Sequence, residues 1–294
     1  MDWVTSHALA IGSALLASFV AAVGIVVRQT ALQNPAVESG TAGAVTVLRD
    51  RLWWAGTAAA VAAYGFQAVA LAHGSLLLVQ PMLVSSLLFV LPLSAVRLGN
   101  RVPGSEWGWA TLLTAALAVF VLVGRPREGH YRPETPAWTL ALGLVVPVVV
   151  AVVAARHSAG RVRATWLGVA VALLLGMIAV LTKTCTHRYA VGGWHALFTS
   201  PAPYVLVTLA VAATVLQQWA FRAGALQASV PIMLVGEPVV AVLLGSVVLG
   251  EHLAAHGIGV VALPAAIAAM LAATIALARG EGAQIEEAAS TLRR

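Results

Sequence analysis

The stretch ALAHGSLLLVQPMLV (residues 70–84) returns 150 residues later in a related form, AFRAGALQASVPIMLV (220–235). An ungapped alignment of residues 67–84 with 217–234 contains five identities. They pair Gln67 with Gln217, Ala70 with Ala220, Gly74 with Gly224, Leu76 with Leu226, and Pro81 with Pro231. A glutamine, a glycine and a proline that recur at one fixed offset predict that the chain contains two related halves.

The composition indicates a membrane protein. Of 294 residues, 60% are hydrophobic and only 10% are charged, and the mean hydropathy is +0.91. A soluble domain carries about 25% charged residues, so this chain has too few to cover a surface in water. The net charge of +6 fits basic loops that orient membrane helices better than it fits a nucleic-acid partner. The single cysteine, Cys185, excludes an internal disulfide and makes a zinc-thiolate cluster implausible.

Apolar runs of about 20 residues, separated by Gly, Pro and charged residues, predict nine spanning helices. The N-terminal run lacks a basic leader and is longer than a signal-peptide core, so we expect it to be the first span. The connection 29–52 contains an apolar stretch (40–48) that is too short to span and predicts a surface or re-entrant segment. The expected spans are 8–28, 53–72, 76–97, 106–124, 137–156, 164–185, 201–221, 226–249 and 255–278.

The distribution of basic residues predicts the orientation. Twelve Lys and Arg residues fall on one side of the expected spans and five fall on the other. Cytoplasmic loops are the ones enriched in Lys and Arg, so we expect the first side to be cytoplasmic. The chain is then a multi-pass protein of the inner (plasma) membrane, with its N-terminus outside and its C-terminus in the cytoplasm.

The repeat and the number of spans together predict the architecture. Helices 1–4 match helices 6–9, and the single additional crossing between them turns the second set upside down. The expected fold class is therefore an all-α polytopic membrane protein with two inverted four-helix repeats joined by a linker helix. The expected parts are the first repeat (1–124), the linker helix with its loops (125–163), the second repeat (164–278) and a cytoplasmic tail (279–294). Inverted repeats are typical of secondary transporters, although duplication without a transport role is an alternative.

Two stretches resemble a known transporter superfamily. EPVVAVLLGSVVLGEHLAAHGIGVVALPAAIAAML (237–271) is similar to the C-terminal helix pair of the drug/metabolite transporter superfamily, whose EamA-type members carry a related LGE…G pattern. GAVTVLRDRLWWAG (43–56) and AYGFQAVALAHGSLLLVQPMLVSSLLF (63–89) resemble its NIPA-like branch, which has nine spans. These stretches cover about a quarter of the chain, and most of their positions are apolar. The resemblance implies a transporter fold without naming the substrate, and the NIPA branch is associated with magnesium.

Glu237 is the main candidate for a functional residue. It lies in the middle of the span 226–249, whereas the other ten acidic residues fall in expected loops, helix ends or tails. A carboxylate at that depth is costly unless it is protonated, paired or exposed to water, so it marks a functional site by default. Its counterpart in the repeat, Leu87, is apolar. The alternative is a permanently protonated Glu that hydrogen-bonds to a neighbouring helix.

Several polar residues within the spans are further candidates. Lys183 lies in the polar stretch LTKTCTHRY (181–189), where it can bind an anionic group, partner Glu237 or extend to the headgroups. Intramembrane amides either line a polar cavity or simply tie helices together. The amide and hydroxyl candidates are Gln67, Gln217, Gln80 and Tyr64.

Four prolines predict broken helices at the site. Pro81 and Pro92 fall in the third span, and Pro231 and Pro238 fall in the eighth. Interrupted helices at corresponding positions of two repeats point to a transporter's binding site, because they free backbone groups for a ligand. The alternative is ordinary tolerance of proline within packed membrane helices.

The sequence predicts a secondary transporter rather than an enzyme. It contains no phosphate-binding glycine loop and no nucleophile elbow, and its eight histidines are scattered, so we expect no cofactor and no metal site. We expect alternating-access transport of a small organic metabolite or drug-like solute, coupled to an ion or proton gradient. One alternative is a NIPA-like magnesium or divalent-cation transporter. Another is a non-transporting membrane subunit or an accessory to a lipid-carrier flippase. The substrate, the coupling ion, the direction of transport and the oligomeric state (monomer or homodimer) stay open.

Overall fold

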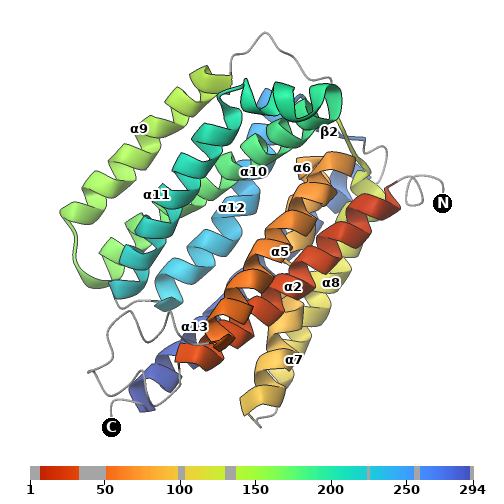
Figure 1. Cartoon of the computed structure of the whole chain (residues 1–294). Coiled ribbons are helices and arrows are strands. Elements are labelled where there is room, and N and C mark those ends of the chain that lie inside the picture. The colour runs from red at the N-terminus through yellow and green to blue at the C-terminus, as the bar shows by residue number, and fades with distance from the viewer. Residues whose placement is uncertain are drawn as a thin grey trace.

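The computed structural model describes residues 7–32, 51–98, 103–129, 137–223, 226–254 and 259–291. These ranges form a bundle of elongated helices (Figure 1). A two-residue antiparallel pair of strands, β1 (Pro126–Arg127) and β2 (His252–Leu253), accompanies it. The helices are α2 (Ala8–Leu32), α5 (Arg51–His73), α6 (Leu76–Leu83), α7 (Ser86–Leu98), α8 (Gly104–Gly124), α9 (Ala137–Arg156), α10 (Gly160–Phe198), α11 (Ala202–Arg222), α12 (Leu226–Val248) and α13 (Gly259–Thr291).

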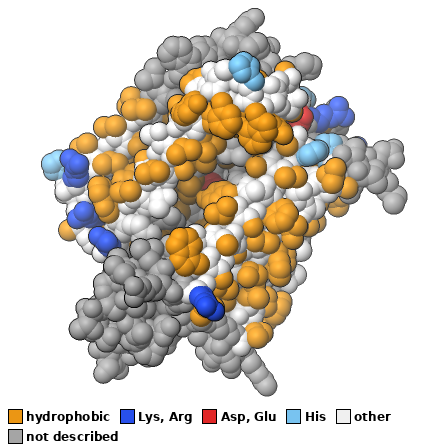
Figure 2. Space-filling model, in the orientation of Figure 1, with side chains coloured by type: hydrophobic (Ala, Val, Ile, Leu, Met, Phe, Trp, Pro, Cys, Tyr) orange, Lys and Arg blue, Asp and Glu red, His pale blue; other side chains and the backbone are white. Residues whose placement is uncertain are grey.

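The described residues confirm a multi-pass membrane protein. Eight stretches of these helices are long and apolar enough to cross a membrane, and α6 and α7 together make one of them. A shorter apolar stretch, Gly143–Arg156, belongs to α9, which occupies the place expected for the linker helix. Hydrophobic side chains far outnumber charged ones on the described part of the face shown in Figure 2, as expected where lipid replaces water. The segment expected to be a surface or re-entrant element (40–48) lies outside the described residues.

Helix boundaries follow the 150-residue offset of the sequence repeat. Helix α5 covers residues 51–73, and α11 covers residues 202–222. The pair α6 and α7 covers residues 76–98, whereas α12 covers residues 226–248. The packing is also similar in the two halves, because α2 packs against α5, α6 and α7 as α10 packs against α11 and α12. Helices α8 and α13, the fourth of each set, pack against each other.

Glycines allow the closest helix contacts in the second half. A Cβ added at Gly176 of α10 would lie 2.5 Å from Val240 Cγ1, and one added at Gly236 of α12 would lie 2.6 Å from Ala172 Cβ. Neither position leaves room for a side chain. Small residues let membrane helices approach closely and gain packing energy, so these positions hold α12 against α10.

The third span is broken, and its short first half lies at the centre of the bundle. All seven residues from Leu76 to Met82 are buried. Helix α6 ends at Leu83, two residues after Pro81, and α7 begins at Ser86. The Met82 carbonyl accepts hydrogen bonds from the Ser85 hydroxyl at 2.6 Å and the Ser18 hydroxyl of α2 at 3.2 Å. The Ser85 amide also donates to this carbonyl at 3.0 Å, so one amide and two hydroxyls satisfy the backbone at the break.

The corresponding break expected in the eighth span is absent. Helix α12 continues through both Pro231 and Pro238, so the expectation of paired broken helices is wrong for this span. A proline removes one backbone hydrogen bond from a helix, but neighbouring helices and small local adjustments can accommodate it in a membrane. Pro92 likewise lies inside α7 without ending it.

Helix α10 is much longer than the expected span 164–185. Its 39 residues would extend about 58 Å at 1.5 Å per residue, roughly twice the thickness of the hydrocarbon core. Non-helical dihedrals at Gly192 and Gly193 kink it, and Gly193 has φ +61°, a conformation that favours glycine. Beyond the kink, Trp194 packs against Tyr189 and Phe198, with ring centroids 4.9 and 5.8 Å apart. These half-exposed rings are of the kind that gathers at membrane interfaces.

Candidate functional site

Glu251 is a buried carboxylate that holds the beginning of α6. Its side chain is fully buried, although it follows α12 in a short connection. Oε1 accepts a hydrogen bond from the Leu76 amide and Oε2 accepts one from the Leu77 amide, both at 3.0 Å. The Ser75 hydroxyl accepts from the next amide, that of Leu78, at 3.2 Å. The first three amides of α6 are therefore satisfied, and a negative charge lies at the positive end of the helix dipole.

Lys183 compensates the charge of Glu251 and connects three segments. Its Nζ lies 3.3 Å from Glu251 Oε1 and 2.8 Å from Glu128 Oε1. It also donates a hydrogen bond to the Gly74 carbonyl at 2.6 Å. Lys183 is on α10, Glu128 follows β1, and Gly74 lies between α5 and α6. We call this arrangement of Gly74, Glu128, Lys183 and Glu251 the Lys183 cluster, and the side of the bundle that carries it the Lys183 end.

The two-stranded pairing reinforces the same end. Pro126 pairs with Leu253 and Arg127 pairs with His252, and the Ala254 amide donates to the Gly124 carbonyl at 3.0 Å. The connections after α8 and after α12 are thus joined by backbone hydrogen bonds beside the Lys183 cluster. This end is held together by four segments that are far apart in the sequence.

Glu237 lies away from this cluster, in the middle of α12. Its neighbour Gly236 packs against Ala172, and Lys183 is eleven residues further along α10, about 16 Å away along the helix axis. The structure therefore does not bring together the pair Lys183 and Glu237 that the sequence left open. Glu237 is partly exposed, and it forms no hydrogen bond or ion pair with another of the described residues.

An apolar cavity of about 180 Å³ adjoins this level of the bundle. Pro81 of α6 and Pro238 of α12 both line it, together with Phe120 of α8 and Thr274 of α13. Two of the four predicted prolines, one from each half, thus face one cavity. Its walls are almost entirely apolar, which suits a hydrophobic part of a ligand better than a bare ion.

The remaining candidates are not gathered in one place. Gln80 is buried in α6, and its Nε2 has no hydrogen-bond partner among the described residues, which is costly inside a protein. Gln67 and Gln217 are partly buried on α5 and α11, and Tyr64 is 58% exposed. Among the described residues, no three His, Cys, Asp or Glu side chains lie together as a metal-ion site would require.

Glu251 received no role in the sequence analysis, because it counts as one of the acids in loops or at helix ends. Two signals were nevertheless present. Glu251 is the acidic residue of the LGE stretch (249–251), and Lys183 is a cation within an apolar helix that needs a compensating charge. Neither signal specifies that the carboxylate binds the amides of a helix beginning 175 residues earlier.

A bundle of apolar helices with ionisable groups in its interior defines a polytopic α-helical membrane protein. The chain is 38% identical over 277 residues to uncharacterized protein Cgl0250/cg0304 of Corynebacterium glutamicum, a match that covers 93% of this chain and 96% of that protein. It therefore belongs to the same family as the C. glutamicum protein. No family model and no solved structure match the chain.

Proposed function

We propose that the protein is a secondary transporter that moves a small organic solute by alternating access, with Glu237 as the residue that couples transport to an ion or proton gradient. The observation that carries the proposal is a partly exposed carboxylate in the middle of α12 without an ion-pair partner among the described residues. An ionisable group at such a depth is expensive, and its usual role is to bind a substrate, an ion or a proton.

The proposed pair of inverted repeats fits this mechanism. The matched boundaries of α5 with α11, and of α6 and α7 with α12, indicate one unit used twice. The matched helices also run in opposite directions. Helix α5 ends beside Gly74 in the Lys183 cluster, whereas α11 ends at Arg222, which lines a pocket with the connection between α9 and α10. Two such halves can exchange roles as a central site opens first to one side and then to the other.

The substrate proposal rests on the cavity beside α12. With apolar walls from α6, α8, α12 and α13 and a single carboxylate near its level, the site fits an organic cation or a polar solute with an apolar part. The resemblance to EamA-type members of the drug/metabolite transporter superfamily agrees with such a substrate. The resemblance to the NIPA-like branch favours a divalent cation instead. Mg²⁺ prefers six oxygen ligands, so it would have to pass Glu237 largely hydrated.

Transport by the purified protein in liposomes tests the proposal. A panel of Mg²⁺, cationic drugs and amino acids, with and without a pH gradient, distinguishes the organic solute from the divalent cation. Glu237→Gln keeps the shape of the side chain and removes its titration, so uphill transport should fall to the level of protein-free liposomes. Any remaining flux should be passive exchange. Glu237→Asp should retain reduced coupling with a shifted pH profile.

Glu286→Gln is the matched control, because it neutralises a carboxylate in the part of α13 that follows the spanning stretch Val261–Gly280. Its transport should resemble that of the parent. If Glu237→Gln transports uphill as well as the parent does, Glu237 is structural and the coupling role is refuted. Absence of transport across the panel would instead favour the accessory or flippase-subunit alternative.

The proposed orientation places the Lys183 end outside and the C-terminus in the cytoplasm of a plasma membrane. It rests on the excess of basic residues, 12 against 5, on the opposite side. A phosphatase that folds only outside the cytoplasm, fused to the C-terminus, should be inactive. Activity of that fusion would reverse the orientation.

A further inference from the structure

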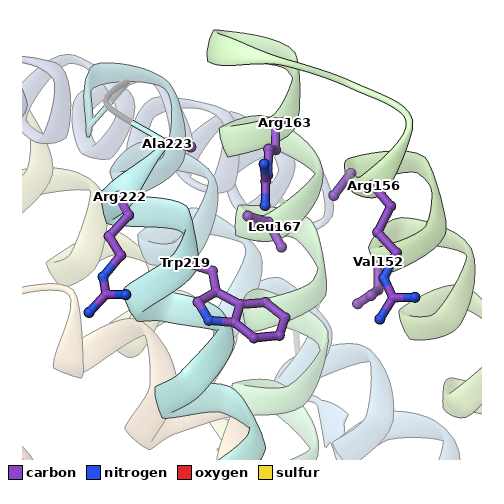
Figure 3. Close-up of a pocket in the computed structure, with 8 residues that line it drawn as sticks. Val152, Arg156, Arg163, Leu167, Trp219, Arg222 and Ala223 are labelled. Carbon is purple, nitrogen blue, oxygen red and sulfur yellow. The ribbon is translucent and has the colours of Figure 1, made fainter.

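A pocket of about 400 Å³ opens where α9, α10 and α11 meet, at the end of the bundle opposite the Lys183 cluster. Its lining includes Arg156, the last residue of α9, Arg163 in the first turn of α10, and Arg222, the last residue of α11. We call this side the Arg163 end. Figure 3 shows the Trp219 indole reaching from α11 into the space between α11 and α9, with Arg163 next to it and Arg156 across from it. The Arg222 side chain points away from the indole (Figure 3).

The arginines of this pocket are not neutralised by the rest of the described chain. The guanidinium groups of Arg156, Arg163 and Arg222 form no hydrogen bond or ion pair with another described residue. Figure 2 shows basic side chains grouped at the corresponding edge of the molecule without an acidic side chain among them. The three arginines at this pocket repel one another because their charges have the same sign. An anion bound among them would relieve this repulsion, so the pocket attracts anions.

Helix electrostatics does not explain Arg163. Cations are stabilised at the C-terminal end of a helix, which suits Arg156 and Arg222, but they are disfavoured at the N-terminal end. Helix α10 begins with no acidic residue in its first turn, and Ala159 provides no side-chain cap. Arg163 therefore adds positive charge to the positive end of a helix whose amides have no capping side chain. An anion beside Arg163 would be stabilised by the guanidinium group and by the uncapped amides at the start of α10.

The walls of the pocket indicate that this anion carries apolar chains. Leu167 and Val152 line its inner part below the arginines. Both flanking helices expose valines along the apolar surface that continues from the pocket: Val145, Val146, Val149, Val150 and Val153 on α9, and Val207, Val211 and Val215 on α11. Trp219 is 43% exposed, as an indole at the level of lipid headgroups would be.

We propose that this pocket binds the phosphate group of an anionic phospholipid, held by Arg163 and Arg156 beside Trp219, with its acyl chains along α9 and α11. Guanidinium groups are suited to phosphate because they donate parallel hydrogen bonds and remain charged. The site is separate from the proposed transport site, and the proposal does not depend on transport.

Lipid retention by the purified full-length protein tests this site. Native mass spectrometry after mixing with phosphatidylglycerol or phosphatidylcholine should show tighter binding of phosphatidylglycerol to the parent. Arg163→Gln should weaken that binding about tenfold, the effect of losing one charge-assisted hydrogen bond. Arg161→Gln is the matched control, because it removes the same charge from the same turn of α10 outside the pocket. It should change the affinity less than about twofold.

Equal losses in Arg163→Gln and Arg161→Gln would show that surface charge in general attracts the lipid, and the proposal would be wrong. Equal retention of phosphatidylglycerol and phosphatidylcholine by the parent would also overturn it. A second arm uses inorganic phosphate in place of lipid. If millimolar phosphate displaces the lipid from the parent and raises the melting temperature of the parent but not of Arg163→Gln, the ligand is a soluble phosphate compound rather than a lipid.

Discussion

The two ends of the bundle use their charges in opposite ways. At the Lys183 end, a partly buried lysine, a buried glutamate and backbone amides compensate one another, and four distant segments are joined. At the Arg163 end, three arginines border an open pocket and have no acidic partner among the described residues. Compensated charges inside a protein hold its segments together, whereas uncompensated charges at a surface are available to a ligand. The chain's own groups close the Lys183 end, whereas the charges of the Arg163 end are available to an external ligand.

This difference gives the Lys183 cluster a defined part in the proposed transport cycle. A transporter that opens at the Lys183 end must separate α10 and the connection after α12 from the beginning of α6. That movement exposes Glu251, two amides of α6 and the Lys183 ammonium, all of which water can then solvate. The cluster therefore stabilises the closed state of this end, and its variants should change the stability of that state first.

The largest expected effect comes from removing the buried carboxylate. Glu251→Ala leaves Lys183 without its buried partner and leaves two amides of α6 unsatisfied. Breaking a buried ion pair from one side costs about 3–5 kcal/mol. We expect a loss of this size in the free energy of unfolding, measured in detergent with a chemical denaturant. Glu128→Ala removes the half-exposed partner of the same lysine and should cost about 1 kcal/mol or less. Equal losses in the two variants would refute the dominant role of Glu251.

A double-mutant cycle measures the next effect, the coupling between Lys183 and Glu251. Lys183→Met and Glu251→Gln each remove one charge and keep most of the side-chain volume. The double variant should be more stable than the sum of the single losses predicts, by about 1–3 kcal/mol, because it leaves no buried charge without a partner. The melting curves of the four proteins in one detergent give this value. Additive losses would show that the 3.3 Å contact contributes nothing to the stability of this end.

Much of the fold could be predicted from the sequence because membrane spans are specified by local hydropathy and length. The expected and observed boundaries of α5, α9, α11 and α12 differ by only a few residues, and the repeat predicted the 150-residue offset between helices. The observed helices differ from the expected ones where tertiary contacts determine whether a helix continues or ends. Helix α12 continues through its prolines, and α10 continues past the expected end at residue 185 to a glycine kink.

The candidate site was less predictable. The pattern of apolar residues predicts where a residue lies along a span, but it does not predict which residues of other helices it contacts. The sequence identified Glu237 and Lys183 as unusual, and the structure separates them along α10 and α12. The partner of Lys183, Glu251, looked like an ordinary acid at a helix end. Arg163 appeared only as one of the basic residues that orient the chain, since the pocket depends on three helices meeting at one point.

The smallest expected effect has the opposite sign and concerns the backbone at the Lys183 end. Arg125 follows α8 with φ +40° and ψ +62°, the left-handed conformation that ends many helices and normally belongs to glycine. A residue with a Cβ is disfavoured there, so Arg125→Gly should relieve strain next to β1. Arg125→Ala is the matched variant, because it removes the same charge and keeps the Cβ. We expect Arg125→Gly to be about 1 kcal/mol more stable than Arg125→Ala in detergent unfolding. The comparison of the two variants cancels the loss of a cation from the end of α8.

Equal stability of Arg125→Gly and Arg125→Ala would mean that residue 125 leaves the left-handed conformation at little cost and that the connection to β1 is not fixed. A clear advantage for glycine would show that this end is held in one backbone conformation, as an end closed by the chain itself requires.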